Sequence, residues 1–234
     1  MQPIKHITAS LAFILVTVTL YSGDTIVPLA GEVREPTGMY TGDKYFKNEW
    51  LKGDVMLENG IVAENVKLRY NGLIDEVFWL HEGSLQHIML DRGLVSGFRM
   101  YVPEENEMLL FEKVERSLLR MQGSKELYVQ VLYDDIVTLY AYRQVSRKRD
   151  VYVRRGHSRY IFTELEHDPV YFFVLPGDVI VRLDALNRRD VYRAFPEIRD
   201  ELRSIFRQRR SFSGEEQLLT ETADHLNSIF KGRK

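Results

Sequence analysis

Apolar and polar residues alternate in short runs between Trp50 and Val181, and turn-forming residues separate the runs. A period of two is typical of strands that bury one face. Two Asn-Gly pairs, Asn59-Gly60 and Asn71-Gly72, stand between such runs, and Asn-Gly favours the two-residue turn of a β-hairpin. The pattern predicts a meander of roughly 10 to 12 short antiparallel strands. After these turns, strands are expected at residues 108–113, 117–122, 127–132, 136–145, 159–165, 170–175 and 179–183.

Close to Asp184 the spacing of apolar residues changes to that of helices. Pro196 suits the first residue of a helix, because its missing N–H costs nothing there. One apolar stripe follows it, and Ser213 to Glu216 has the pattern of a capping box that starts a second stripe ending at Phe230. A shorter helix is expected at residues 187–194. The first stripe consists of Ile198, Leu202, Ile205 and Phe206.

These elements together predict a mainly β (α+β) fold. An antiparallel β meander forms a curved sheet or barrel, and two to three C-terminal helices pack on it. We expect an extended lead at residues 23–48, a β domain at 49–184 and a helical segment at 185–234. A chain of this length can bury one large hydrophobic core.

The first 22 residues have the pattern of a signal peptide. Lys5 is the only charged side chain before Asp24, and residues 7–21 are apolar or small, apart from Thr and Ser. A positive residue ahead of about 15 such residues is typical of a cleavable signal, whereas a bilayer span needs roughly 20. A retained membrane anchor and a buried N-terminal strand are the weaker alternatives. Cleavage is expected after Ser22 or Gly23, with Ala30 as a later candidate.

The sequence contains no cysteine. A bacterial lipoprotein needs a lipid-modified cysteine at its cleavage site, so we expect an exported periplasmic or envelope-associated protein that is not a lipoprotein. Disulfides and a thiol nucleophile are excluded as well. Stability must therefore come from the hydrophobic core, and a composition with 44% hydrophobic and 28% charged residues is that of an ordinary globular protein.

A family resemblance rests on a few segments. Residues 48–54 (NEWLKGD), 58–60 (ENG) and 66–71 (VKLRYN), followed by Asp75, resemble a segment of uncharacterised exported proteins of Bacteroidota-type bacteria. Those proteins also end in a short helical region, as residues 195–230 do in this chain. The resemblance implies export and architecture, and no activity accompanies it.

Candidate catalytic groups are few. Five histidines follow the signal segment, and none has the spacing of metal ligands, so no metal or other cofactor is expected. Asp134-Asp135 and the acidic cluster at residues 164–168 could supply carboxylates, but we interpret both as turn or strand-end residues. Trp50 and Trp79 could form a carbohydrate platform, but their apolar context favours core packing.

Charge is distributed unevenly along the chain. Residues 24–142 carry 12 Lys and Arg against 20 Asp and Glu, whereas residues 143–234 carry 19 against 14. The basic half includes a dense stretch interleaved with Tyr and His that begins at Arg143. Such a stretch can bind anions. We favour a solvated hairpin whose arginines pair with the acidic half, and we keep the stretch as the candidate anionic-ligand patch. That patch comprises Arg147, Lys148, Arg149, Arg154 and Arg155.

The leading functional hypothesis is a non-enzymatic binding or structural module of the cell envelope. Its partner would be an envelope protein, a lipid headgroup or an anionic glycan. Nucleic acid is not expected, because an exported protein rarely meets it, and no transmembrane span remains after signal cleavage. The first alternative is a lipid carrier with a barrel-like cavity. The second is a hydrolase that uses carboxylates such as Asp134 or Glu164.

Overall fold

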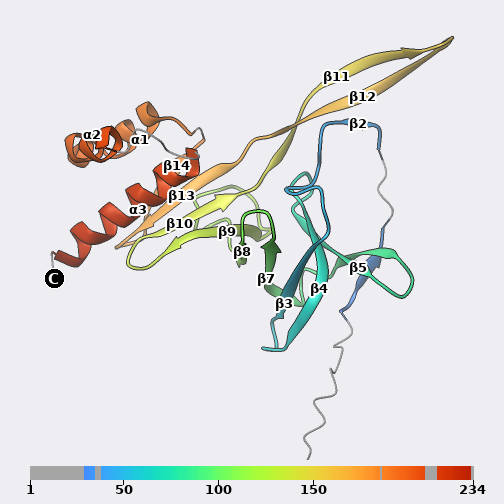
Figure 1. The fold of residues 1–234 in the computed structure, drawn as a ribbon, viewed down its shortest axis with the longest axis horizontal. Helices are drawn as coiled ribbons and strands as arrows, with labels where there is room; N and C mark the ends of the chain where they lie inside the picture. The colour runs from blue at the N-terminus through green and yellow to red at the C-terminus, as the bar shows by residue number, and fades with distance from the viewer. Residues whose placement is uncertain (1–28, 35–37, 185, 209–214, 233–234) are drawn as a thin grey trace, which may run out of the picture.

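A computed structural model describes residues 29–34, 38–184, 186–208 and 215–232. An 11-stranded antiparallel sheet carries the fold, a 3-stranded sheet projects from it, and the helices follow at the C-terminus (Figure 1). The mainly antiparallel β prediction is confirmed, as are the three C-terminal α-helices. The predicted signal peptide lies outside the described residues.

The larger sheet brings the N-terminal lead to one edge and the last strands to the other. In spatial order its strands are β1 (Gly31–Val33), β6 (Gln86–Leu90), β5 (Glu76–His81), β4 (Val62–Asn71), β3 (Leu51–Leu57), β7 (Val95–Val102), β8 (Glu107–Val114), β9 (Leu127–Asp134), β10 (Thr138–Tyr142), β13 (Val170–Leu175) and β14 (Val179–Leu183). The smaller sheet comprises β11 (Val145–Arg155), β12 (Ser158–His167) and β2 (Tyr40–Thr41). The helical part comprises α1 (Arg188–Ala194), a 3-10 turn (Pro196–Ile198), α2 (Arg199–Gln208) and α3 (Glu215–Gly232).

Of the two predicted forms, a curved sheet or a barrel, the structure has the curved sheet. β1 and β14 are the two edges of the large sheet and do not pair with each other, so the sheet is curved but open. Register shifts at Gly53/Val55 and Met56/Leu57 interrupt the pairing of β3, and such irregularities increase strand twist. The last strands, β10, β13 and β14, bury their apolar side chains without barrel closure, because the C-terminal helices cover them.

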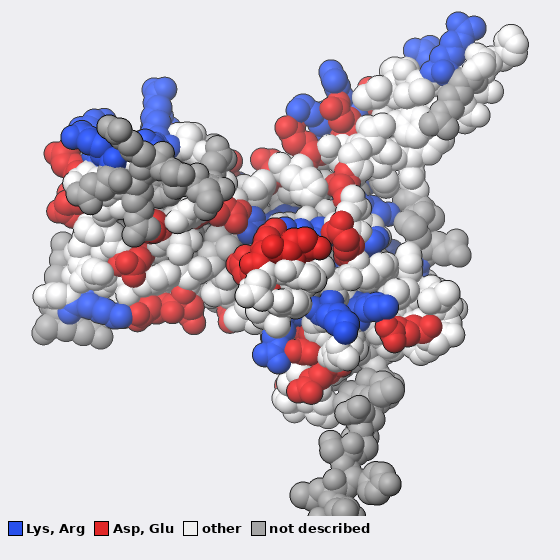
Figure 2. All heavy atoms as spheres, viewed as in Figure 1, with Lys and Arg blue, Asp and Glu red and all other residues white. Residues whose placement is uncertain are grey.

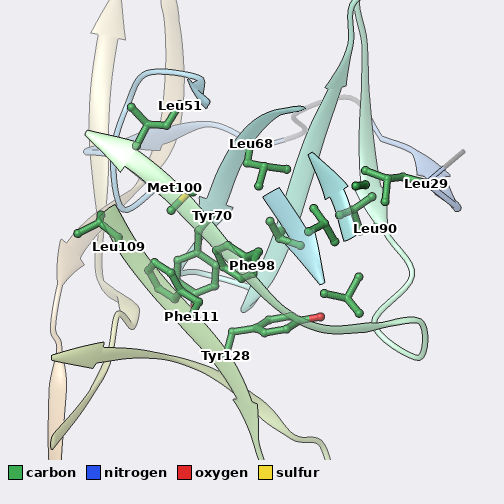
Figure 3. Close-up of a cluster of buried hydrophobic side chains, with 14 of the residues drawn as sticks. Leu29, Leu51, Leu68, Tyr70, Leu90, Phe98, Met100, Leu109, Phe111 and Tyr128 are labelled. Carbon is green, nitrogen blue, oxygen red and sulfur yellow. The ribbon is translucent and has the colours of Figure 1, made fainter. Parts of the chain in front are cut away.

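The first hydrophobic core lies inside the curved part of the sheet, between β3 and β9 (Figure 3). The rings of Phe98 and Phe111 stack with centroids 4.6 Å apart, and the Tyr70 ring lies 5.3 Å from Phe111. Leu29, from the N-terminal lead, also packs into this core. The lead therefore takes part in the fold, because β1 pairs with β6 and β2 pairs with β12.

The second hydrophobic core joins the helices to β10, β13 and β14. Alternate residues of β10 face it, as Leu139 and Ala141 do. Phe206 of α2 and Leu219 of α3 pack against them, and both are almost fully buried. The apolar stripes of the helices are thus explained, because each helix buries its apolar face against β10, β13 and β14.

The two Asn-Gly pairs have different roles. Gly60 has φ +83° and closes a tight turn between β3 and β4, but three residues, not the predicted two, lie between the facing residues Leu57 and Ile61. Asn71-Gly72 is not a two-residue hairpin turn, because Asn71 pairs with Glu76 and four residues lie between them. A Cβ on Gly72 would lie 2.2 Å from the carbonyl oxygen of Arg143. Gly72 is therefore required by a close approach of two chain segments.

The prediction of a strand at residues 117–122 is wrong. This segment is a turn: the amide of Leu119 donates to the carbonyl of Arg116 at 3.1 Å, and the Arg116 side chain donates to the carbonyl of Lys125 at 2.8 Å. Leu119 alone is driven into the interior, where it is 1% exposed. A single buried apolar residue in a turn, with exposed residues on each side, gives the same sequence pattern as a strand with alternating burial.

Arg143 is buried where β10 ends and the chain leaves the large sheet. Its Nε donates to Gln130 of β9 at 2.7 Å, and its two terminal nitrogens form an ion pair with Glu216 of α3. Its guanidinium also lies over the Phe46 ring, 4.6 Å from the centroid. Tyr171 of β13 donates its hydroxyl to Glu216 at 2.6 Å. These five residues, the Arg143 cluster, join the lead, the sheet and the last helix.

We predict that Glu216→Gln destabilises the protein by about 1–3 kcal/mol at neutral pH, because the buried guanidinium loses its counter-ion. Burial opposes the charge of Glu216, but Arg143 and Tyr171 outweigh that effect and lower the pKa of Glu216. A lowered folded-state pKa contributes stability above the ordinary value of 4.5, and that stability is lost as the pH falls below it. Urea denaturation should therefore show a difference between the two proteins that shrinks in acid. A pH-independent difference would contradict this assignment.

Candidate functional site: the β11–β12 hairpin

The candidate patch lies on β11, in a hairpin that projects from the rest of the molecule (Figure 1). β10 runs into β11 and β12 runs into β13, so the hairpin is a continuation of two neighbouring strands near one edge of the large sheet. β2 adds a third strand only beside Thr163 and Glu164, at the boundary between the inner and outer parts of the hairpin. A two-stranded ribbon is at most marginally stable in water, so the outer part depends on its attachment to the sheet.

The inner part of the hairpin is neutralised by its own acidic residues. Lys148 pairs with Glu166 at 2.7 Å, and Arg149 pairs with Glu164 at 2.6 Å. The hydrogen bond to Glu166 raises the pKa of Lys148. The predicted ion pairing of this stretch is thus seen, but its partners are on the neighbouring strand of the hairpin and not in the acidic half of the chain.

The outer part, residues 151–163, carries three arginines and no acidic residue. The register places Tyr152 opposite Ile161 and Arg154 opposite Arg159 on one face. The Arg159 guanidinium lies over the Tyr152 ring, 4.3 Å from its centroid. Tyr152 and Ile161 are 58% and 53% exposed and lie opposite each other, so they form a contiguous exposed apolar patch.

The opposite face of the outer part is apolar too. Val151 lies opposite Phe162, and Val153 lies opposite Tyr160, which is 38% exposed. The outer hairpin therefore has aromatic and aliphatic side chains on both faces and positive charge towards its turn. Figure 2 shows basic side chains at the outer end of the hairpin and acidic ones near its base.

The five predicted patch residues thus form two groups. Arg147 is exposed and, like Lys148 and Arg149, belongs to the inner part. Arg154 lies in the outer part, where its Nε donates to the carbonyl of Gly156 at 3.3 Å, and Arg155 is the last residue of β11. Arg143, which opens the basic stretch in the sequence, is not at the surface. What sequence reasoning missed is the contribution of Tyr152, Tyr160 and Ile161.

The candidate carboxylates are not brought together. Asp134 ends β9, and Asp135 follows it in the turn to β10, where it pairs with Lys231 of α3. Glu164 pairs with Arg149 in the other sheet. About 11 residues of strand, or roughly 35 Å at the usual rise, separate the Asp134 turn from the Arg149 position. That distance far exceeds the roughly 5–9.5 Å between the carboxylates of a glycosidase. Within the described ranges, no group of three or more metal-ligating side chains is gathered either.

The tryptophans are held by neighbouring side chains. Trp79 is partly buried against the first core, as predicted. Trp50 lies between the Arg69 guanidinium, 4.7 Å from its ring centroid, and the His87 ring at 5.0 Å. These contacts account for both rings without a carbohydrate ligand.

A buried ion-pair network joins the first core to the loops beside it. Asp75, which has φ +55°, accepts hydrogen bonds from the Tyr70 hydroxyl at 2.7 Å and from Arg92 at 3.0 Å. Arg92 also contacts Glu76 at 3.4 Å, and Lys125 pairs with Glu76 at 2.7 Å. We interpret this network as structural, because its charges neutralise one another and it connects β4 and β5 to the loops that precede β7 and β9.

We predict that Asp75→Asn lowers the free energy of unfolding by about 3 kcal/mol, because it leaves the buried Arg92 without one of its two carboxylates. Asn tolerates the left-handed backbone conformation of this position, so the change isolates the charge. Glu105→Gln is the matched control: it removes one carboxylate from the exposed pair with Lys47 and should cost about 1 kcal/mol or less. Equal losses in chemical denaturation would show that burial of the pair is unimportant.

No helix in the described part of the chain is long and apolar enough to cross a bilayer. No protein-family model, curated protein or solved structure matches this chain. The resemblance to exported Bacteroidota-type proteins therefore stays a prediction, and the functional argument depends on the geometry of the hairpin.

Proposed function

We propose that this chain is a non-enzymatic, exported binding module of the cell envelope that attaches to an anionic membrane surface through the outer part of its β11–β12 hairpin. One observation carries the proposal: residues 151–163 combine three arginines and no acidic residue with apolar side chains on both faces. Export is the expectation drawn from the N-terminal sequence, and the proposal adopts it.

A membrane interface suits both properties of the outer hairpin. A protein partner would cover one face of a two-stranded ribbon, whereas the lipid interface surrounds both faces. Tyr side chains are favoured at that interface, and each Lys or Arg near an anionic leaflet contributes about 1 kcal/mol. A polar glycan would not bury the apolar side chains of Ile161, Val151 and Phe162. With the outer hairpin inserted into the interface so that lipid contacts both faces, arginines near the turn reach phosphates while the apolar side chains contact the acyl boundary.

The alternatives from the sequence are less well supported. The lipid carrier needs a barrel-like interior, but the sheet is open and its concave side is filled by the first core. The hydrolase needs carboxylates that meet, but Asp134 and Glu164 lie far apart along the ribbon. Neither alternative explains the exposure of Tyr152 and Ile161.

The proposal is tested by co-sedimentation with vesicles of phosphatidylglycerol and phosphatidylethanolamine, with phosphatidylcholine vesicles as the neutral reference. Arg154→Gln with Arg159→Gln should lower the partition coefficient for anionic vesicles roughly 10- to 30-fold, since two interfacial cations are removed. Tyr152→Ser with Ile161→Ser should lower it at least about tenfold through lost apolar burial. Binding of the wild-type protein should weaken as salt is raised.

The charge-matched control is Lys52→Gln with Arg120→Gln. Both residues are exposed and lie outside the hairpin, on β3 and in the turn before β9. This variant has the same net charge as the Arg154/Arg159 variant and should bind like the wild type. Equal binding to neutral vesicles would point to an apolar anchor, and binding to an acidic polysaccharide without vesicle binding would point to a glycan. Either result would overturn the proposal of an anionic membrane surface as the partner.

The site of signal cleavage is also constrained by the fold. Leu29 is 7% exposed in the first core, and the amide of Asp91 donates to the carbonyl of Ala30 at 3.0 Å. Cleavage after Ala30 would remove a core side chain, so we predict a mature chain that begins directly after Ser22 or Gly23. Intact-mass measurement of the exported protein checks this, and a chain starting at Gly31 would contradict it.

A further inference from the structure

A second basic surface lies on the helices. Between α1 and the start of α2 is a concavity of about 610 Å³ in which no acidic side chain takes part. Figure 2 shows Lys and Arg over α1 and α2 at the upper left of the view, while the outer hairpin lies at the upper right. The concavity, which we call the arginine concavity, is lined by Arg188, Arg189, Tyr192, Arg193, Pro196 and Arg199.

Three of the four arginines, Arg188, Arg189 and Arg199, stand at helix starts, which is unfavourable for the helices. Arg193 is in the last turn of α1, where a cation is favourable. Arg188 and Arg189 are the first two residues of α1, and Arg199 is the first residue of α2. The partial positive charge of a helix N-terminus disfavours cations there. Clustering the four arginines around one concavity adds mutual repulsion. Helix stability therefore does not explain this arrangement, whereas an anionic ligand would.

Neutralisation within the protein is incomplete. Arg193 pairs with Asp190 at 3.1 Å. Arg189 and Arg199 are exposed, and the described residues include no ion pair for either of them. Two guanidinium groups are thus available for an external anion, and the planar guanidinium is well suited to bind phosphate oxygens in pairs.

The helices and the hairpin are joined by the same strands. α1, α2 and α3 pack on β10 and β13 in the second core, and β11 and β12 continue those strands outwards. The arginine concavity and the outer hairpin thus belong to one connected framework. Two sites held together in this way gain from effective concentration when one surface can meet both.

We propose that the arginine concavity binds the phosphate group of an anionic lipid and is a second contact with the membrane that the outer hairpin meets. This inference rests on the proposed function, because it takes the same membrane as the partner. It adds an orientation: the side that carries α1 and α2 faces the bilayer together with the hairpin.

The test uses Arg189→Gln with Arg199→Gln in the full chain and the same phosphatidylglycerol vesicles. We expect the partition coefficient to fall roughly 10- to 30-fold, and to fall further when Arg154→Gln and Arg159→Gln are added. Thermal unfolding should be unchanged or improved, because two cations leave helix N-termini. The Lys52/Arg120 variant again serves as the charge-matched control.

The outcomes separate this inference from the proposed function. If the Arg189/Arg199 variant binds vesicles within about twofold of the wild type while the Arg154/Arg159 variant loses binding, the second contact is overturned and the hairpin proposal stands. If the wild type does not prefer anionic vesicles, both fail. If Arg189 and Arg199 are needed to bind inorganic phosphate in a titration but not to bind vesicles, the concavity takes a soluble anion and the membrane contact is overturned.

Discussion

The buried guanidinium of Arg143 is the interaction on which the arrangement of this molecule depends. A charge taken out of water must be paired, and Arg143 finds Glu216 of α3, Gln130 of β9 and the ring of Phe46 in the lead. Its own carbonyl approaches Gly72 so closely that a side chain there would collide with it. Helix, sheet, lead and the loop after β4 are therefore joined at the point where the chain leaves the sheet to form the hairpin.

In this arrangement the two hydrophobic cores stabilise the fold, while the hairpin stays exposed to solvent. The first core fills the curved part of the sheet, and the second core lies between the helices and the last strands. The hairpin adds little burial of its own, and it keeps its direction because β10 and β13 are clamped at its base. A projecting ribbon with exposed Tyr152 and Ile161 is costly in water, and that cost is the physical reason to look for its partner.

Much of the fold could be predicted from the sequence because its signals are local. Alternation predicted the antiparallel strands, Gly60 marked its turn, and the apolar stripes predicted α2 and α3. The errors occurred where a distant contact decides the local conformation. Gly72 is required by its close contact with Arg143 and not by a hairpin turn. Leu119 is buried from a loop because it packs with apolar side chains of β9, β10 and β13.

The sequence by itself determined that the chain is mainly antiparallel β with a helical end, that it has no thiol chemistry, and that its positive charge lies in the second half. Only the tertiary structure decided which of those charges are available. Arg143 is buried, Lys148 and Arg149 are neutralised by Glu166 and Glu164, and the outer hairpin and the arginine concavity keep an excess of positive charge. The physical reason is that pairing depends on strand register and helix docking, which bring together residues far apart in the chain.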